Sequence, residues 1–143
     1  MQRTSHGSTL SWVTHAWVLA RADRPRSWQL LSQALDSDFA DLQGGTTPEG
    51  IHLGAMAGTV DLIQRAYTGI ETRSDTLYLN PCLPGELGTL SLCIFYRGHS
   101  LAVGITHDRL GVVSRRGRAR PVRIGVKKKI FRLKPGDRID VHL

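Results

Sequence analysis

The chain has 143 residues, of which 41% are apolar, and a formal net charge of +7. This length and composition allow one ordinary hydrophobic core or two small ones. No apolar run approaches the roughly 20 residues that a membrane-spanning helix needs. The segment Met1–Leu10 also lacks the apolar core of a signal peptide. We therefore expect a cytoplasmic protein and no membrane partner.

The charge is distributed unevenly along the chain. Residues 1–88 contain six Lys or Arg against nine Asp or Glu, a net of −3, and residues 89–143 contain thirteen against three, a net of +10. This contrast indicates two modules with different surroundings. Cys82 and Cys93 do not have the spacing of metal ligands, so we expect a pair of buried, reduced thiols.

Two helices are predicted before the first glycine-rich stretch. The segment Ser8–Ala22 has a wide apolar face, which favours a helix that is largely buried. A second helix is predicted from Asp23 to Phe39, with Asp23 as its N-cap and Pro25 in its first turn. Its apolar positions follow helical spacing at Trp28, Leu31, Leu35 and Phe39.

A third helix is predicted to begin after Thr47, with Pro48 at its first position, and to run to about Tyr67. Glycines occupy every fourth position of this segment, at Gly50, Gly54 and Gly58. A glycine inside a helix costs about 0.8–1 kcal/mol relative to alanine, so we expect a compensating gain. The stripe allows the close approach of a ligand or backbone, or the close packing of another helix, and both explanations stay open.

From Ile70 onwards the chain changes to short, alternating runs that are rich in β-branched residues. Turn sequences such as "NPCLPGELG", "RGRA" and "KPGD" separate these runs. The pattern predicts six or seven antiparallel strands in a small β-sandwich. The whole chain is therefore expected to belong to the α+β class.

Three segments resemble the C-terminal end of glycoside hydrolase family 65, whose members include inverting disaccharide phosphorylases. They are "HGSTLS" with the following His15–Ala16, "GGTTPEGIHLGAMAGTVDLIQRAYTG" and "LYLNPCLPGELGTLSLCIFYRGHSLAVGIT". The resemblance extends from about Thr4 to the end of the chain. It implies that residues 1–69 are the last helices of a catalytic (α/α)6 barrel. Residues 70–143 would then form the β-sheet C-terminal domain.

The resemblance also implies an activity for a complete enzyme. In this family phosphate attacks the anomeric carbon of an α-glucoside such as trehalose, maltose or kojibiose, and a glutamic acid protonates the leaving sugar. Some members are hydrolases that use water. The segment matched here lies downstream of that glutamic acid, so we expect the chain to be inactive alone. Its partners would be a disaccharide, inorganic phosphate as co-substrate with no other cofactor, and the missing barrel portion or a second copy. The sequence leaves open which disaccharide is used and whether water replaces phosphate.

The start of the third predicted helix is a candidate anion site. A helix N-terminus offers free N–H groups and the positive end of the helix dipole. The local pattern alone favours an ordinary capped helix. The resemblance instead implies a phosphate site, formed by His6, Ser8, Thr46, Thr47 and His52. Glu49 is either an auxiliary residue or general base of that site, or an ordinary first-turn carboxylate.

The basic stretch "RRGRARPVRIGVKKKIFRLK", residues 115–134, favours a different class of function. Such a stretch can neutralise the phosphates of a nucleic acid. However, Phe131 is its single aromatic residue, and single-strand binders usually interleave several. A solvated sheet face is the simpler explanation. The histidines without ligand spacing are expected to be structural, namely His15, His99, His107 and His142.

Overall fold

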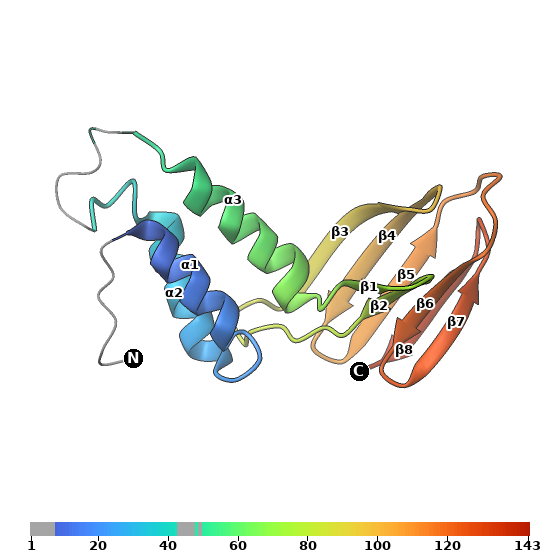
Figure 1. Cartoon of the computed structure of the whole chain (residues 1–143). Helices are drawn as coiled ribbons and strands as arrows, with labels where there is room; N and C mark the ends of the chain where they lie inside the picture. The colour runs from blue at the N-terminus through green and yellow to red at the C-terminus, as the bar shows by residue number, and fades with distance from the viewer. Residues whose placement is uncertain (1–7, 43–47, 49) are drawn as a thin grey trace. The chain divides into compact units, whose positions relative to one another are not determined.

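The computed structural model describes residues 8–42, 48 and 50–143. These residues form two compact units, shown in Figure 1. The first, the helical unit, takes its residues from 1–66 and 84–86, and the second, the sheet unit, consists of residues 67–83 and 87–143.

The helical unit contains α1 (Thr9–Leu19), α2 (Arg24–Asp36) and α3 (Leu53–Asp61), and α3 continues into a π-helical turn (Leu62–Tyr67). As predicted, Asp23 caps α2, because its carboxylate accepts the backbone N–H of Arg26 at 3.1 Å. The buried side chains between the helices are mostly small or aliphatic: Val13, Ala16, Leu30, Leu31, Ala34, Ala55 and Leu62. The buried Ser27 hydroxyl donates to the carbonyl of Ala16 at 2.7 Å and joins α2 to α1.

The predicted apolar face of α2 is partly wrong. The helix ends at Asp36, so Phe39 lies beyond it and is 87% exposed. Leu35 is also exposed, whereas Leu31 is buried as predicted. The helical unit therefore presents a set of large apolar side chains to solvent: Leu10, Val18, Leu35, Phe39, Leu42, Ile51, Leu53 and Val60. Three helices of this length cannot cover all of their own apolar surface.

The third helix begins later than the sequence predicts. Gly50 has a φ of +93°, a left-handed conformation that a helix cannot contain, and α3 starts only at Leu53. A Cβ atom on Gly58 would lie 2.7 Å from Cγ1 of Val13, and one on Gly54 would lie 3.4 Å from Leu10. Close packing against α1 therefore explains Gly58, and a positive φ explains Gly50, whereas a Cβ atom on Gly54 would meet only the exposed Leu10 side chain.

The sheet unit is a β-sandwich of two four-stranded sheets, with eight strands among the residues that the structure describes (Figure 1). The first sheet has the order β1 (Glu71–Arg73), β2 (Thr76–Leu79), β6 (Val122–Val126), β7 (Lys129–Leu133). The second has the order β3 (Thr89–Tyr96), β4 (His99–Thr106), β5 (Arg109–Ser114), β8 (Arg138–His142). Neighbouring strands are antiparallel as predicted, except that β2 and β6 run parallel.

Alternating apolar residues of both sheets form the core of the sandwich, including Leu77, Leu79, Leu101, Val103, Ile105, Val112, Ile124 and Leu133. The prediction of two buried thiols is wrong. Cys93 is exposed, because the alternation of β3 directs it away from the core, and Cys82 is half-buried. His99 is structural as predicted. It is buried, and its Nε2 donates to the Arg120 carbonyl at 2.9 Å while Nδ1 accepts from the Ser114 hydroxyl at 2.7 Å.

Candidate functional site

Two residues of the predicted phosphate site fall within the described part of the chain, Ser8 and His52. The other four candidates, His6, Thr46, Thr47 and Glu49, lie outside the described residues. Ser8 is the N-cap of α1, and its Oγ accepts the backbone N–H of Leu10 at 3.3 Å. His52 occupies the N-cap position of α3. Each of the two candidates therefore lies at the beginning of a helix, where backbone N–H groups are unpaired within the helix.

His52 is held by a carboxylate that the sequence analysis did not identify. Asp38 accepts the His52 backbone N–H at 2.8 Å through Oδ2 and faces the ring nitrogen Nδ1 at 2.6 Å through Oδ1. The Asp38 side chain is 5% exposed, and the His52 side chain is 36% exposed. The carboxylate is thus enclosed, while part of the imidazole still faces solvent.

No sequence signal marks Asp38. It lies fourteen residues before His52, beyond any helical or strand spacing. It also falls within the segment that the sequence assigns to the end of α2, where an acidic residue looks like an ordinary surface group. Only the turn after Ser37, the C-cap of α2, directs it towards α3.

The hydrogen bonds from His52 lower the pKa of Asp38 below the usual range, and the ring bond has the largest effect. An aspartate with a lowered folded-state pKa adds stability above its unfolded pKa and loses it as the pH falls through the folded pKa. We therefore expect the stability difference between wild type and Asp38→Asn to be complete at neutral pH and to shrink below about pH 4.

Urea unfolding at several pH values, followed by tryptophan fluorescence, measures this difference. Asp36→Asn is the matched control, since Asp36 is exposed and is the last residue of α2, two positions before Asp38. A wild-type advantage over Asp38→Asn that persisted unchanged at pH 2.5 would contradict the expected origin in the ionised carboxylate.

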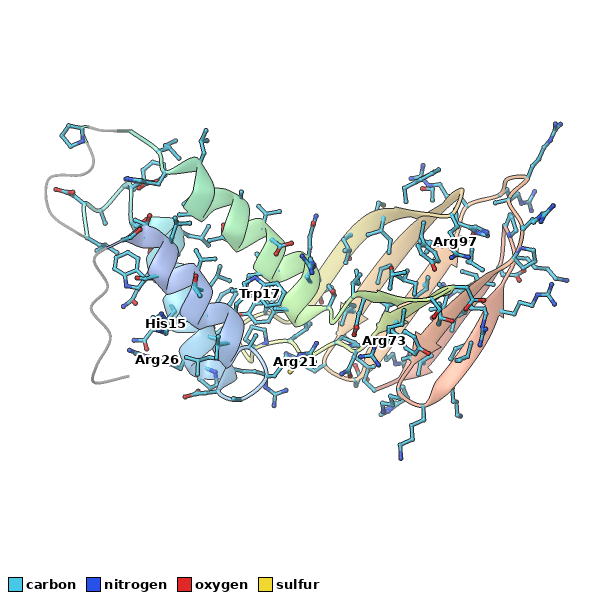
Figure 2. The ribbon with its side chains drawn as sticks, viewed as in Figure 1. His15, Trp17, Arg21, Arg26, Arg73 and Arg97 are labelled. Carbon is cyan, nitrogen blue, oxygen red and sulfur yellow. The ribbon has the colours of Figure 1, made fainter. Side chains whose placement is uncertain are left out.

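The basic residues of the sheet unit are exposed, as a solvated sheet face requires. Some of them pair with acids: Nη1 of Arg123 lies 3.2 Å from Oδ1 of Asp75, and Arg138 makes two bonds to Asp140. Arg73 lies over the ring of Tyr78, with Cζ 5.4 Å from the ring centroid, and is labelled in Figure 2. In the helical unit Arg65 lies over Trp17 in the same way, at 5.7 Å. Exposed ion pairs of this kind contribute little stability.

The described residues contain no group of three or more His, Cys, Asp or Glu side chains that could hold a metal ion. Among the same residues, no helix has both the length and the apolar character needed to cross a membrane.

Comparison with known families places both parts of the chain. The model of the glycosyl hydrolase family 65 central catalytic domain matches residues 1–61, and the model of the glycosyl hydrolase family 65 C-terminal domain matches residues 70–142. The chain belongs to glycosyl hydrolase family 65. This confirms the predicted family and the predicted fold class, in which barrel helices precede a β-sandwich.

Several relatives match along most of this chain. An uncharacterized glycosyl hydrolase of Mycobacterium tuberculosis is 48% identical over 99% of the chain, which corresponds to 11% of the relative. A kojibiose phosphorylase of Caldanaerobacter subterraneus is 34% identical over 90% of the chain and 17% of the relative. A trehalose 6-phosphate phosphorylase of Lactococcus lactis is 33% identical over 77% of the chain and 14% of the relative. The chain therefore spans less than a fifth of the length of each of these relatives.

A solved structure has the same fold. The putative kojibiose phosphorylase from human microbiome superimposes with a TM-score of 0.81 at 22% identity, covering 99% of this chain and 18% of that one.

Proposed function

We propose that this chain acts as the C-terminal part of an inverting α-glucoside phosphorylase and supplies part of its phosphate-binding subsite. The observation that supports this most directly is His52, which is held by Asp38 at the start of α3 and keeps an exposed edge. The relatives named as phosphorylases support the same reaction class. The complete enzyme would be cytoplasmic, with inorganic phosphate as co-substrate and no other cofactor.

In this proposal an oxygen of phosphate forms a bond to the anomeric carbon of the disaccharide as the glycosidic bond breaks on the opposite face. The leaving sugar takes a proton from a glutamic acid of the upstream barrel portion, and the product is a β-sugar 1-phosphate. This chain contributes by positioning the phosphate, through the side chains of His6, Ser8, Thr46, Thr47 and His52 and nearby N–H groups. Alone it should be inactive.

The exposed apolar residues of the helical unit agree with such a role. Phe39 and Leu53 are 87% and 77% exposed, and Val18 is 71% exposed. Apolar surface of this extent usually marks a surface that another part of the protein covers. We infer that the rest of an (α/α)6 barrel covers it in the complete enzyme.

The test joins this chain to the upstream portion of the 48% identical relative and supplies trehalose, maltose or kojibiose with and without phosphate. We expect consumption of one disaccharide only with phosphate, and a β-sugar 1-phosphate visible by ³¹P NMR. Free glucose released at the same rate without phosphate would instead show a hydrolase, the second candidate, which the description of that relative as a glycosyl hydrolase favours. Turnover by the 143-residue chain alone would contradict its proposed dependence on the barrel portion.

In the joined enzyme, His52→Ala should raise the KM for phosphate about ten- to hundredfold, because a hydrogen bond to a charged group contributes about 1.5–3 kcal/mol. The KM for the disaccharide should stay within about twofold, since His52 is proposed to contact phosphate alone. Initial rates over a range of phosphate concentrations give both constants. His107→Ala, an exposed histidine of the sheet unit, is the control. An unchanged phosphate KM in His52→Ala would refute the assignment of this residue.

A further inference from the structure

Asp38 and His52 connect two helices that are separated in sequence. Asp38 follows α2 and its C-cap Ser37, and His52 immediately precedes α3. Both carboxylate oxygens of Asp38 are directed at this one residue, one at its backbone and one at its ring. The pair therefore fixes the start of α3 relative to the end of α2.

The two contacts fix the orientation of the imidazole as well as the position of the backbone. The bond to the backbone N–H sets where the Cα of His52 lies, and the 2.6 Å contact at Nδ1 sets the rotation of the ring. A side chain held at two points loses less freedom when it binds a ligand than a free one does. This is the arrangement expected for a histidine that must present one ring atom in a fixed direction.

The chemistry of the pair also determines the tautomer. An ionised carboxylate is only an acceptor, so Nδ1 of His52 must carry the proton in this contact. The second nitrogen, Nε2, is then left for another partner. When the ring is protonated, Nε2–H is a charge-assisted donor suited to an anion such as phosphate.

We propose that Asp38 is a positioning residue for phosphate binding, which it supports by holding the ring of His52 with Nδ1 protonated and Nε2 available. This inference rests on the proposed function, because it assigns Asp38 a role in the same subsite. Asp38 itself does not contact the phosphate, since a second anion there would be repelled.

The first experiment uses the joined enzyme described above. Asp38→Asn should raise the phosphate KM about tenfold and leave the disaccharide KM within about twofold. The matched control, Asp36→Asn, makes the same chemical change two residues earlier on α2 and should leave both constants unchanged. Since Asp38 is proposed to act through His52, Asp38→Asn should add no further increase in an enzyme that already contains His52→Ala.

The outcomes separate this inference from the proposed function. If His52→Ala raises the phosphate KM but Asp38→Asn behaves like Asp36→Asn, the positioning role is refuted and the proposed function stands. If neither His52→Ala nor Asp38→Asn affects the phosphate KM, the positioning role and the assignment of His52 are both refuted, while the phosphate dependence of turnover decides the reaction class separately. If Asp38→Asn raises the phosphate KM by the same factor in the wild-type and the His52→Ala enzymes, Asp38 has a general structural role, and the inference is also overturned.

A second measurement needs no enzyme activity, and its decisive result comes from the wild-type chain. In the ¹⁵N-labelled 143-residue chain, ring nitrogen shifts distinguish the two tautomers of a neutral histidine. We expect the neutral ring of His52 to carry its proton on Nδ1. Asp38→Asn, which removes the carboxylate charge, should weaken that preference. A neutral His52 ring with its proton on Nε2 in the wild-type chain would overturn the proposal, even if the variants failed to fold.

Discussion

Replacing Gly58 by alanine should destabilise the helical unit, although alanine is the better helix former. The new Cβ would lie 2.7 Å from Cγ1 of Val13, far inside an ordinary carbon–carbon contact. Val13 is buried and β-branched, so it has few other rotamers to adopt. Overpacking destabilises by about 1–3 kcal/mol, whereas the better helix propensity of alanine stabilises by about 0.8–1 kcal/mol. We therefore expect the free energy of unfolding to fall by up to about 2 kcal/mol.

Gly54→Ala is the matched control on the same helix. Its Cβ would lie 3.4 Å from Cδ2 of Leu10, an ordinary contact with an exposed side chain that is free to move. We expect this variant to be more stable than wild type by up to about 1 kcal/mol. Tryptophan fluorescence during urea unfolding reports on this unit alone, since all three tryptophans, Trp12, Trp17 and Trp28, belong to it. If the free energy of unfolding changed in the same direction in Gly58→Ala and Gly54→Ala, the packing explanation would be contradicted.

The features predicted correctly from the sequence depend on neighbouring residues. The cap at Asp23 is visible because its partner, the backbone of Arg26, is three residues away. The strands are visible because burial alternates along each of them. The parallel pairing of β2 with β6 joins segments more than forty residues apart, and no local pattern distinguishes it from an antiparallel one.

The late start of α3 shows the limit of helical periodicity as a signal. Gly50, Gly54 and Gly58 have equal spacing in the sequence, yet Gly50 adopts a positive φ before α3, and of the two glycines inside α3 only Gly58 packs too closely for a Cβ atom. Composition cannot distinguish these uses, because glycine is favoured for both. The prediction that Phe39 lies on the apolar face of α2 is wrong for a related reason. Its spacing from Leu35 fits a helix, but α2 ends at Asp36.

The candidate site was predictable only in part. His52 was proposed through the family resemblance, and the structure places it at the N-cap of α3, because that helix starts later than the predicted position at Pro48. Asp38 was missed because its partner is distant in sequence and its neighbours give it the appearance of a surface residue. A buried carboxylate with a lowered pKa beside an imidazole is recognised only from coordinates.

Gly125→Ala should disturb the centre of the first sheet of the sandwich. Gly125 on β6 lies opposite Tyr78 on β2, and a Cβ there would lie 2.4 Å and 2.5 Å from two atoms of the Tyr78 ring. Arg73 covers the same ring, so alanine must displace the ring and disturb that contact. We expect the free energy of unfolding to fall by about 1–3 kcal/mol because of overpacking, and by about 0.5–1 kcal/mol more because the cation–π contact is disturbed.

Hydrogen exchange followed by mass spectrometry locates this effect, and faster exchange is expected in the peptides that contain β2 and β6. Gly104→Ala on β4 is the control, because it is exposed and its Cβ would meet nothing within 4 Å. The loss should also disappear in a chain that already contains Tyr78→Ala, since the ring that alanine would displace is then absent. If Gly125→Ala costs as much there as in wild type, the cost arises from the glycine backbone rather than from the ring above it.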